Sequence, residues 1–191
     1  MVDEARLEAV GSGLAPVSDG WFVVNVGEAA WVRNDAFGGR CVFESSPRVL
    51  ADRPDLEPQR FSQVGYTLAV LEPGKPTGMY HGESVQEDFL VLAGECLLVI
   101  EGEERHLGAW DFVHCPAGTE HVFVGAGEDP CVIFMTGARS AEGTIVYPRS
   151  EAARAHGAGV ETETGLPSEA YTPFPHWGLG RPEAWSRLPW A

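Results

Sequence analysis

The sequence predicts an all-β fold, and three observations favour this class. Between residues 61 and 139, short apolar runs alternate at regular spacing with turn signals, as in β-sandwiches and β-barrels. Glycine (23 residues) and proline (14 residues) are frequent among the 191 residues, which fits many turns and short strands. Several runs, such as "CLLVI", do not alternate apolar with polar residues, as expected for strands that are covered on both faces.

Residues 1–60 are predicted to form an N-terminal arm and strands that pack on the main domain. A charged arm is followed by two apolar stretches, "GWFVVNV" (20–26) and "AAWVRNDAFGGRCVFE" (29–44). Both are typical of strands, and the second is interrupted by the turn residues Asn-Asp and Gly-Gly. The proline-rich and charge-rich stretch at 45–61 predicts a loop.

Residues 61–139 are predicted to form the core domain. Its expected strands are 63–71, 87–93, 96–102, one or two within 103–115, 121–127 and 131–138, with a short extended segment at 79–84. One face of the two-faced strands would fill the interior of a barrel. We expect the other face to pack on a second layer, on the N-terminal strands or on a partner subunit.

Residues 140–191 are predicted to form a short helix and an aromatic tail. The helix is expected from about Ser150 to His156, with Ser150 as its N-cap. The end, "EAYTPFPHWGLGRPEAWSRLPWA", is rich in Pro, Trp and Gly. Free aromatic side chains would lower solubility, so we expect this tail to wrap around the domain or a neighbouring subunit.

The charge of the chain excludes two classes of partner. Thirteen basic residues against 28 acidic ones give a formal net charge of −15. Such a surface does not attract nucleic acid or an anionic membrane. No apolar run approaches the roughly 18–20 residues needed to span a bilayer, and the acidic start lacks the apolar region of a signal peptide. We therefore expect a cytoplasmic protein.

The four cysteines are Cys41, Cys96, Cys115 and Cys131, and none belongs to a Cys-x-x-Cys pair. In a cytoplasmic protein they are expected to be reduced and buried. A nucleophilic role for Cys115 would require a lowered pKa.

Two stretches hold a set of side chains that can bind a metal ion. His81 and Glu83 lie two residues apart, so they share a face if the chain is extended there. Glu87 begins the next strand after a bend, and His121 follows a Pro-Ala-Gly turn. If they converge, two imidazoles and two carboxylates form a set that suits Zn, Fe or Mn.

These stretches resemble the two motifs of the cupin superfamily. Positions that fall on the first motif are His81, Glu83, Glu87 and Gly94, and those on the second are Pro116, Gly118 and His121. The departures are Lys75 and Trp110 at two Gly positions, Gly125 at an Asn position, and Glu83 in place of the second His. The resemblance covers roughly residues 61–139.

The resemblance implies a double-stranded β-helix (jelly-roll) barrel, here with extra N-terminal strands and a wrapping C-terminal tail. It also implies one divalent transition metal ion held by His81, Glu83, Glu87 and His121. In such proteins barrels commonly pair, so a homodimer is expected. The alternative is a barrel without metal, in which Glu83 faces solvent or pairs with a Lys or Arg.

Three functions are open at this point. The first is a metal-dependent enzyme acting on a small molecule inside the barrel, of dioxygenase, isomerase, decarboxylase or hydrolase type. The second is a non-catalytic module that binds a small molecule or metal. The third is metal-free acid/base catalysis, as in the sugar-nucleotide epimerases of related barrels. The third is disfavoured because the core has few basic residues for a diphosphate, namely Lys75, Arg105 and Arg139.

Other residues near the motifs are expected to be structural. His114 is predicted at the barrel wall or rim, and His106 at the surface. Met79, Phe89 and Phe123 would share the ligand face if the strands are straight, mainly as core residues. Tyr66 and Thr67 are neighbours on one strand and face opposite ways, so at most one of them lines the interior.

Overall fold

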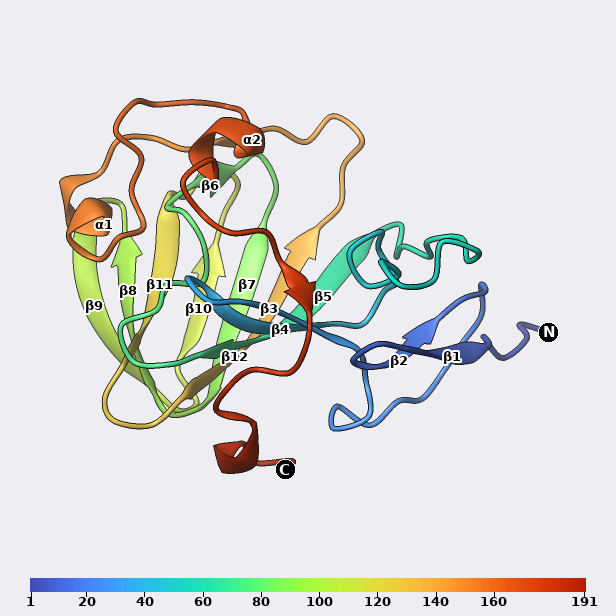
Figure 1. Cartoon of the computed structure of the whole chain (residues 1–191). Helices are drawn as coiled ribbons and strands as arrows, with labels where there is room; N and C mark the ends of the chain where they lie inside the picture. Colours follow the sequence, from blue (N-terminus) through green and yellow to red (C-terminus); the bar gives the residue numbers. More distant parts are fainter.

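The computed structural model describes residues 1–191, and its chain folds mainly into antiparallel β-strands (Figure 1). The larger sheet has seven strands in the order β10-β7-β12-β5-β4-β3-β14. Their bounds are β3 Trp31–Asn34, β4 Gly38–Val42, β5 Val64–Leu71, β7 Glu87–Ala93, β10 Phe112–Cys115, β12 Cys131–Ala138 and β14 Gly178–Leu179. The smaller sheet has the order β11-β8-β9, with bounds β8 Glu95–Ile100, β9 Glu103–Gly108 and β11 His121–Ala126.

The two sheets pack face to face as in a jelly roll. Nine buried residues join them in one cluster: Leu71, Phe89, Val91, Cys96, Leu98, Cys115, Phe123, Cys131 and Ile133. Phe89 of the larger sheet and Phe123 of the smaller one lie with ring centroids 4.7 Å apart. The all-β, jelly-roll prediction is confirmed.

Two turns show where the backbone constrains the sequence. Gly94 joins β7 to β8 with φ 72°, and a Cβ there would lie 2.5 Å from the carbonyl oxygen of Pro130. Only glycine fits both conditions without strain. Trp110 also has a positive φ, 77°. It stands where the cupin motif has Gly, so the left-handed turn is kept although the side chain is large.

The outer face of the larger sheet is covered by the chain's own C-terminal tail. Trp31 of β3 is fully buried between Trp185 and Trp190, with ring centroids 5.4 Å and 5.7 Å away. Leu188 joins the same cluster with Leu68 of β5 and its neighbours. The strand β14 adds the tail to the sheet by pairing with β3. The tail thus supplies a second layer for the two-faced strands.

The N-terminal part differs from its prediction. Strands at 31–34 and 38–42 occur within the predicted run 29–44, but the prediction of a strand at 20–26 is wrong. Instead, β1 (Leu7–Val10) and β2 (Gly13–Pro16) form a hairpin within the predicted arm. The backbone of Leu14 bonds to residues 28 and 30, so β2 takes the pairing position beside the following segment. Val23 is left 82% exposed.

Two short helices lie at the end of the jelly roll where β6 (Gly82–Glu83) pairs with β13 (Ile145–Val146) (Figure 1). The first, α1, spans Glu151–Ala155, and the Ser150 side chain accepts a hydrogen bond from the backbone N–H of Ala153. This confirms the predicted helix and its N-cap. The second, α2, spans Pro167–Ala170, and a 3₁₀ turn follows at Trp185–Arg187.

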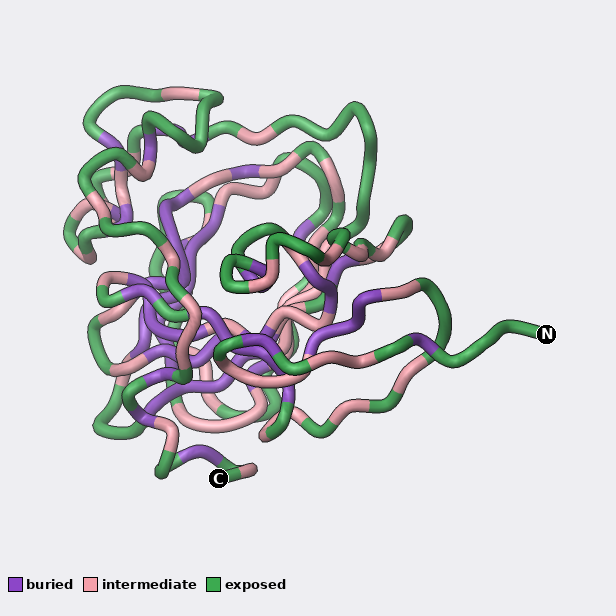
Figure 2. Tube along the Cα trace, turned by 45° about the vertical axis from the view of Figure 1, so that its right-hand side comes forward, coloured by how far each residue is buried: buried purple, intermediate pink, exposed green.

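Burial follows the strands, while the N-terminal end and many outer loops are exposed (Figure 2). The four cysteines are free and buried, as predicted. Burial raises the pKa of Cys115 to about 12, which does not favour a thiolate nucleophile. No helix in the structure has the length and apolar character required to cross a membrane.

Candidate metal centre

A backbone pairing places His81 and His121 side by side. His81 N–H donates to the carbonyl of His121 (3.2 Å), and His121 N–H donates to the carbonyl of His81 (2.8 Å). Residues paired in this way across two strands point their side chains to the same face. The imidazole centroids are accordingly 5.1 Å apart. Residues 40 positions apart thus present two ring nitrogens to one space.

Glu87 completes a group of three. It is the first residue of β7 and lies opposite Gly137 of β12. Its Oε2 is 3.7 Å from His121 Nε2. The donor atoms of His81, Glu87 and His121 all lie within 4.8 Å of one another.

The hydrogen bonds of both imidazoles leave the same nitrogen free. His81 Nδ1 lies 2.7 Å from the carbonyl oxygen of Met79, and His121 Nδ1 lies 3.1 Å from that of Thr119. A carbonyl only accepts, so each Nδ1 carries the proton and donates. Each neutral ring then presents the lone pair of Nε2 toward the carboxylates. Metal-bound histidines use this tautomer, with the other ring nitrogen bonded to a backbone carbonyl or carboxylate.

Glu83 lies at the edge of this group. Its Oε1 is 3.9 Å from His81 Nε2, and its side chain is 34% exposed against 14% for Glu87. It is not one of the three residues whose donor atoms mutually lie within 4.8 Å. The structure therefore brings three of the four predicted ligands together and leaves the fourth beside one of them.

Burial sets the charges of the group without metal. It lowers the pKa of His121 to about 4, with a further contribution from His81, and it lowers the pKa of His81 as well. It raises the pKa of Glu87 to about 8, and the charge of Glu83 adds to this. Near pH 7 both imidazoles are therefore neutral and Glu87 is protonated. A metal ion has to displace one proton, from Glu87.

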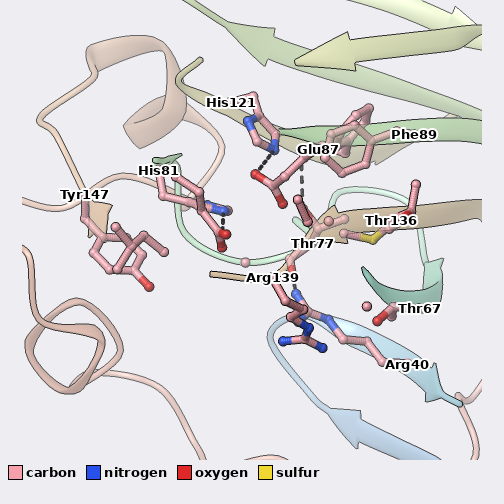
Figure 3. A pocket seen from close by; sticks show the side chains of 18 of the residues that line it. Arg40, Thr67, Thr77, His81, Glu87, Phe89, His121, Thr136, Arg139 and Tyr147 are labelled. Carbon is pink, nitrogen blue, oxygen red and sulfur yellow. Dashed lines mark hydrogen bonds and ion pairs between the residues drawn. The ribbon is translucent and has the colours of Figure 1, made fainter. Parts of the chain in front are cut away.

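These side chains line a cavity of about 320 Å³ (Figure 3). His121 and Glu87 lie at one side of it, and Arg40 and Arg139 lie at the other. The sequence did not identify further lining residues that come from distant segments: Arg40, Thr77, Ile145, Tyr147 and Tyr171. Their positions depend on long-range packing, and no local spacing signals them.

Of the apolar and polar side chains near the two motifs, some line the cavity and others face away from it. Phe89 and Phe123 line the cavity, but Met79 does not, since it packs with Phe37 and Tyr147. Of the neighbours Tyr66 and Thr67 on β5, Thr67 lines the cavity. Its neighbour Tyr66 faces outward and stacks on Phe134.

The four remaining histidines do not line the cavity. His114 is on the outer face, where its Nδ1 lies 2.6 Å from Asp88 Oδ1. His106 and His176 are exposed and do not line the cavity.

The donor set fits a divalent transition metal. Two Nε2 lone pairs and one carboxylate are common ligands of Zn, Fe and Mn, and three protein ligands leave positions open for substrate. To bind the ion, the group has to lose the carboxyl proton of Glu87. Metal binding is therefore opposed near neutral pH only by the proton on Glu87, and less so as the pH rises.

Residues 67–137 match the family model of the cupin domain. Similar solved structures include a sugar phosphate isomerase from Silicibacter pomeroyi, with 28% identity over 56% of this chain and 63% of that chain, and a TM-score of 0.43. A DMSP lyase from Ruegeria pomeroyi has 25% identity over 49% of this chain and 48% of that chain, with a TM-score of 0.41.

A protein with a double-stranded β-helix domain from Klebsiella pneumoniae has 18% identity over 58% of this chain and 85% of that chain, with a TM-score of 0.45. The chain spans less than two thirds of the length of the isomerase and the lyase. Among curated proteins, none matches the sequence significantly.

Proposed function

We propose that this chain, whose residues 67–137 match the family model of the cupin domain, is a metal-dependent enzyme acting on a small molecule in the cavity. His81, Glu87 and His121 hold the ion, and Glu83 is the fourth ligand, reached by rotation of its partly exposed side chain. The observation that carries this proposal is the convergence of the two Nε2 atoms on Glu87 within 4.8 Å.

The bound ion would act as a Lewis acid or redox centre of oxygenase, isomerase or hydrolase type. The chain's own groups set the conditions around it. The backbone carbonyls of Met79 and Thr119 hold each imidazole in the Nδ1–H form. Phe89 and Phe123 give the cavity an apolar wall, which strengthens electrostatic interactions there. Glu87 holds a proton near neutral pH, which leaves when the ion binds.

The test is elemental analysis of the purified protein and its ligand variants. The wild type is expected to hold one Zn, Fe or Mn ion per chain, and His81→Ala and His121→Ala are expected to lose it. His106→Ala, at an exposed histidine on β9, is the matched control and should retain it. Absence of metal from the wild type under every loading condition would refute the proposal.

Glu83 is tested separately from the other ligands. If it is the fourth ligand, Glu83→Gln weakens metal binding. Glu142→Gln, at an exposed carboxylate of the loop between β12 and β13, does not. Equal affinities in the two variants would remove Glu83 from the coordination sphere and leave a three-ligand site.

Metal-free acid/base catalysis is a second candidate. It is favoured by the 3.7 Å separation of Glu87 and His121 and by the pKa of about 8 for Glu87, which suits proton transfer near neutral pH. It would replace the first candidate if the protein takes up no metal. A metal-loaded protein that transforms no small molecule would instead support a non-catalytic binding module.

We further propose a cytoplasmic homodimer. Four free, buried cysteines support a reducing compartment. β10 is the edge strand of the larger sheet; its first residue, Phe112, is 65% exposed, and Trp110, two residues before it, is 74% exposed. An edge strand with exposed aromatic residues favours pairing with another copy. Light scattering should give twice the chain mass for the wild type and a monomer for Phe112→Glu. A monomeric wild type would rule the dimer out.

A further inference from the structure

Arg40 is a cation without an anionic partner. It extends from β4 into the cavity, where its Nη2 donates to the backbone carbonyl of Thr77. No carboxylate forms an ion pair with it, and its Nε is buried without a hydrogen-bond partner. Burial lowers its pKa, which reflects the cost of keeping this charge away from water. Such a cation is stabilised strongly by an anion that reaches it.

The surroundings hold the guanidinium in place. Its central carbon lies 4.7 Å from the ring centroid of Trp177, in cation–π geometry. Gly78 leaves space for the hydroxyl of Tyr171, because a Cβ there would lie 2.7 Å from that oxygen. An arginine fixed in this way loses little conformational freedom when it binds a ligand.

The neighbouring arginine is already neutralised. Arg139 forms an ion pair with the buried carboxylate of Glu44. With a divalent ion bound, the charges of Glu83 and Glu87 balance the ion, and the two histidines are neutral. Arg40 then leaves a single positive charge on the cavity wall, at the side away from His121 and Glu87 (Figure 3).

We infer that the substrate is a small monoanion whose carboxylate pairs with Arg40 while its reacting end lies at the metal centre; this inference rests on the proposed function. A carboxylate matches one guanidinium in charge and geometry. A phosphate monoester, with nearly two negative charges, would leave an excess of negative charge in this cavity. A volume of about 320 Å³ is at the lower end for ligand pockets, so the molecule is small.

The test uses two-ended probes on the zinc-loaded protein. Each probe has a hydroxamate, which binds metal ions, joined by two, three or four methylene groups to a terminal carboxylate, methyl or phosphonate group. Calorimetry measures the dissociation constants. At one chain length at least, the carboxylate probe is expected to bind ten-fold or more tightly than its methyl counterpart. That preference should disappear in Arg40→Met and persist in Arg105→Met, at an exposed arginine of β9 whose side chain is 63% accessible.

The outcomes are distinct. Equal binding of carboxylate and methyl probes at all three lengths would overturn the inference while leaving the metal site intact. Tighter binding of the phosphonate probe than of the carboxylate probe would overturn the assignment to carboxylates. If the protein holds no zinc and binds no probe, the proposed function fails and the inference with it. The wild-type comparison needs no variant, so poor folding of Arg40→Met would not affect it.

Discussion

The two ends of the cavity come from different parts of the chain. His81, Glu87 and His121 all lie within the segment 67–137 that matches the cupin domain. Arg40 lies on β4, outside that segment, and is held by Trp177 near the C-terminus. In our proposal the cupin segment supplies the reactive end and the added segments select the ligand. Changes at one end should therefore leave the properties of the other largely intact.

The largest expected effect separates metal binding from ligand selection. Glu87→Gln should weaken zinc binding at least about 100-fold, because removal of outer-shell partners alone costs roughly 10- to 100-fold. Arg40→Met should change the zinc dissociation constant by no more than about three-fold, since Arg40 is not among the donor groups. Competition with a chromogenic chelator measures both constants. A comparable loss in Arg40→Met would show that the two ends are not independent.

A smaller effect is expected from pH. The metal ion competes with the proton on Glu87, whose pKa burial raises to about 8. Above pH 6.5 both imidazoles are already neutral, because burial lowers the pKa of each. Affinity for Co²⁺ should therefore rise about ten-fold per pH unit between 6.5 and 7.5 and level off above 8. Spectroscopic titration measures this slope. Glu87→Gln should lack it, and the same slope in that variant would assign the proton to another group.

The smallest expected effect concerns the support of Arg40. Trp177→Leu removes the ring beside the guanidinium and should lower the free energy of unfolding by about 1–2 kcal/mol. Urea titration measures this loss, and zinc affinity should stay within about three-fold of the wild type. Because the two side chains are in contact, the changes in the free energy of unfolding in Trp177→Leu and Arg40→Met should not sum to that of the double variant. Full additivity would mean that the contact contributes nothing.

The sequence predicted that His81, Glu87 and His121 converge, because its signals there are local. His81, Glu87 and His121 stand next to turns and strand starts whose spacing fixes their direction. The strands of residues 64–138 were predicted within a few residues for the same reason. Two motif positions show what spacing alone does not predict. Gly94 must be glycine because a Cβ there would meet the backbone of Pro130, whereas Trp110 adopts a left-handed conformation although it is not glycine.

The rest depended on contacts between distant segments. The run at 20–26 has strand composition, but β2 occupies the available pairing position, so the run stays outside the sheets. Arg40 contacts Thr77, 37 residues away, and Trp177, still further along the chain. No periodicity or spacing in the sequence predicts such contacts. The proposed role of Arg40 in binding an anion could therefore be inferred only from the folded structure.

The central claim is that the Nε2 atoms of His81 and His121 and the carboxylate of Glu87 hold one metal ion. Anomalous diffraction from crystals of the zinc-loaded protein tests it directly. We predict one peak at about 2.0–2.2 Å from both Nε2 atoms and from a Glu87 oxygen, with Nδ1 of each histidine still bonded to its backbone carbonyl. A peak elsewhere, coordination through Nδ1, or no peak at this site would contradict the account.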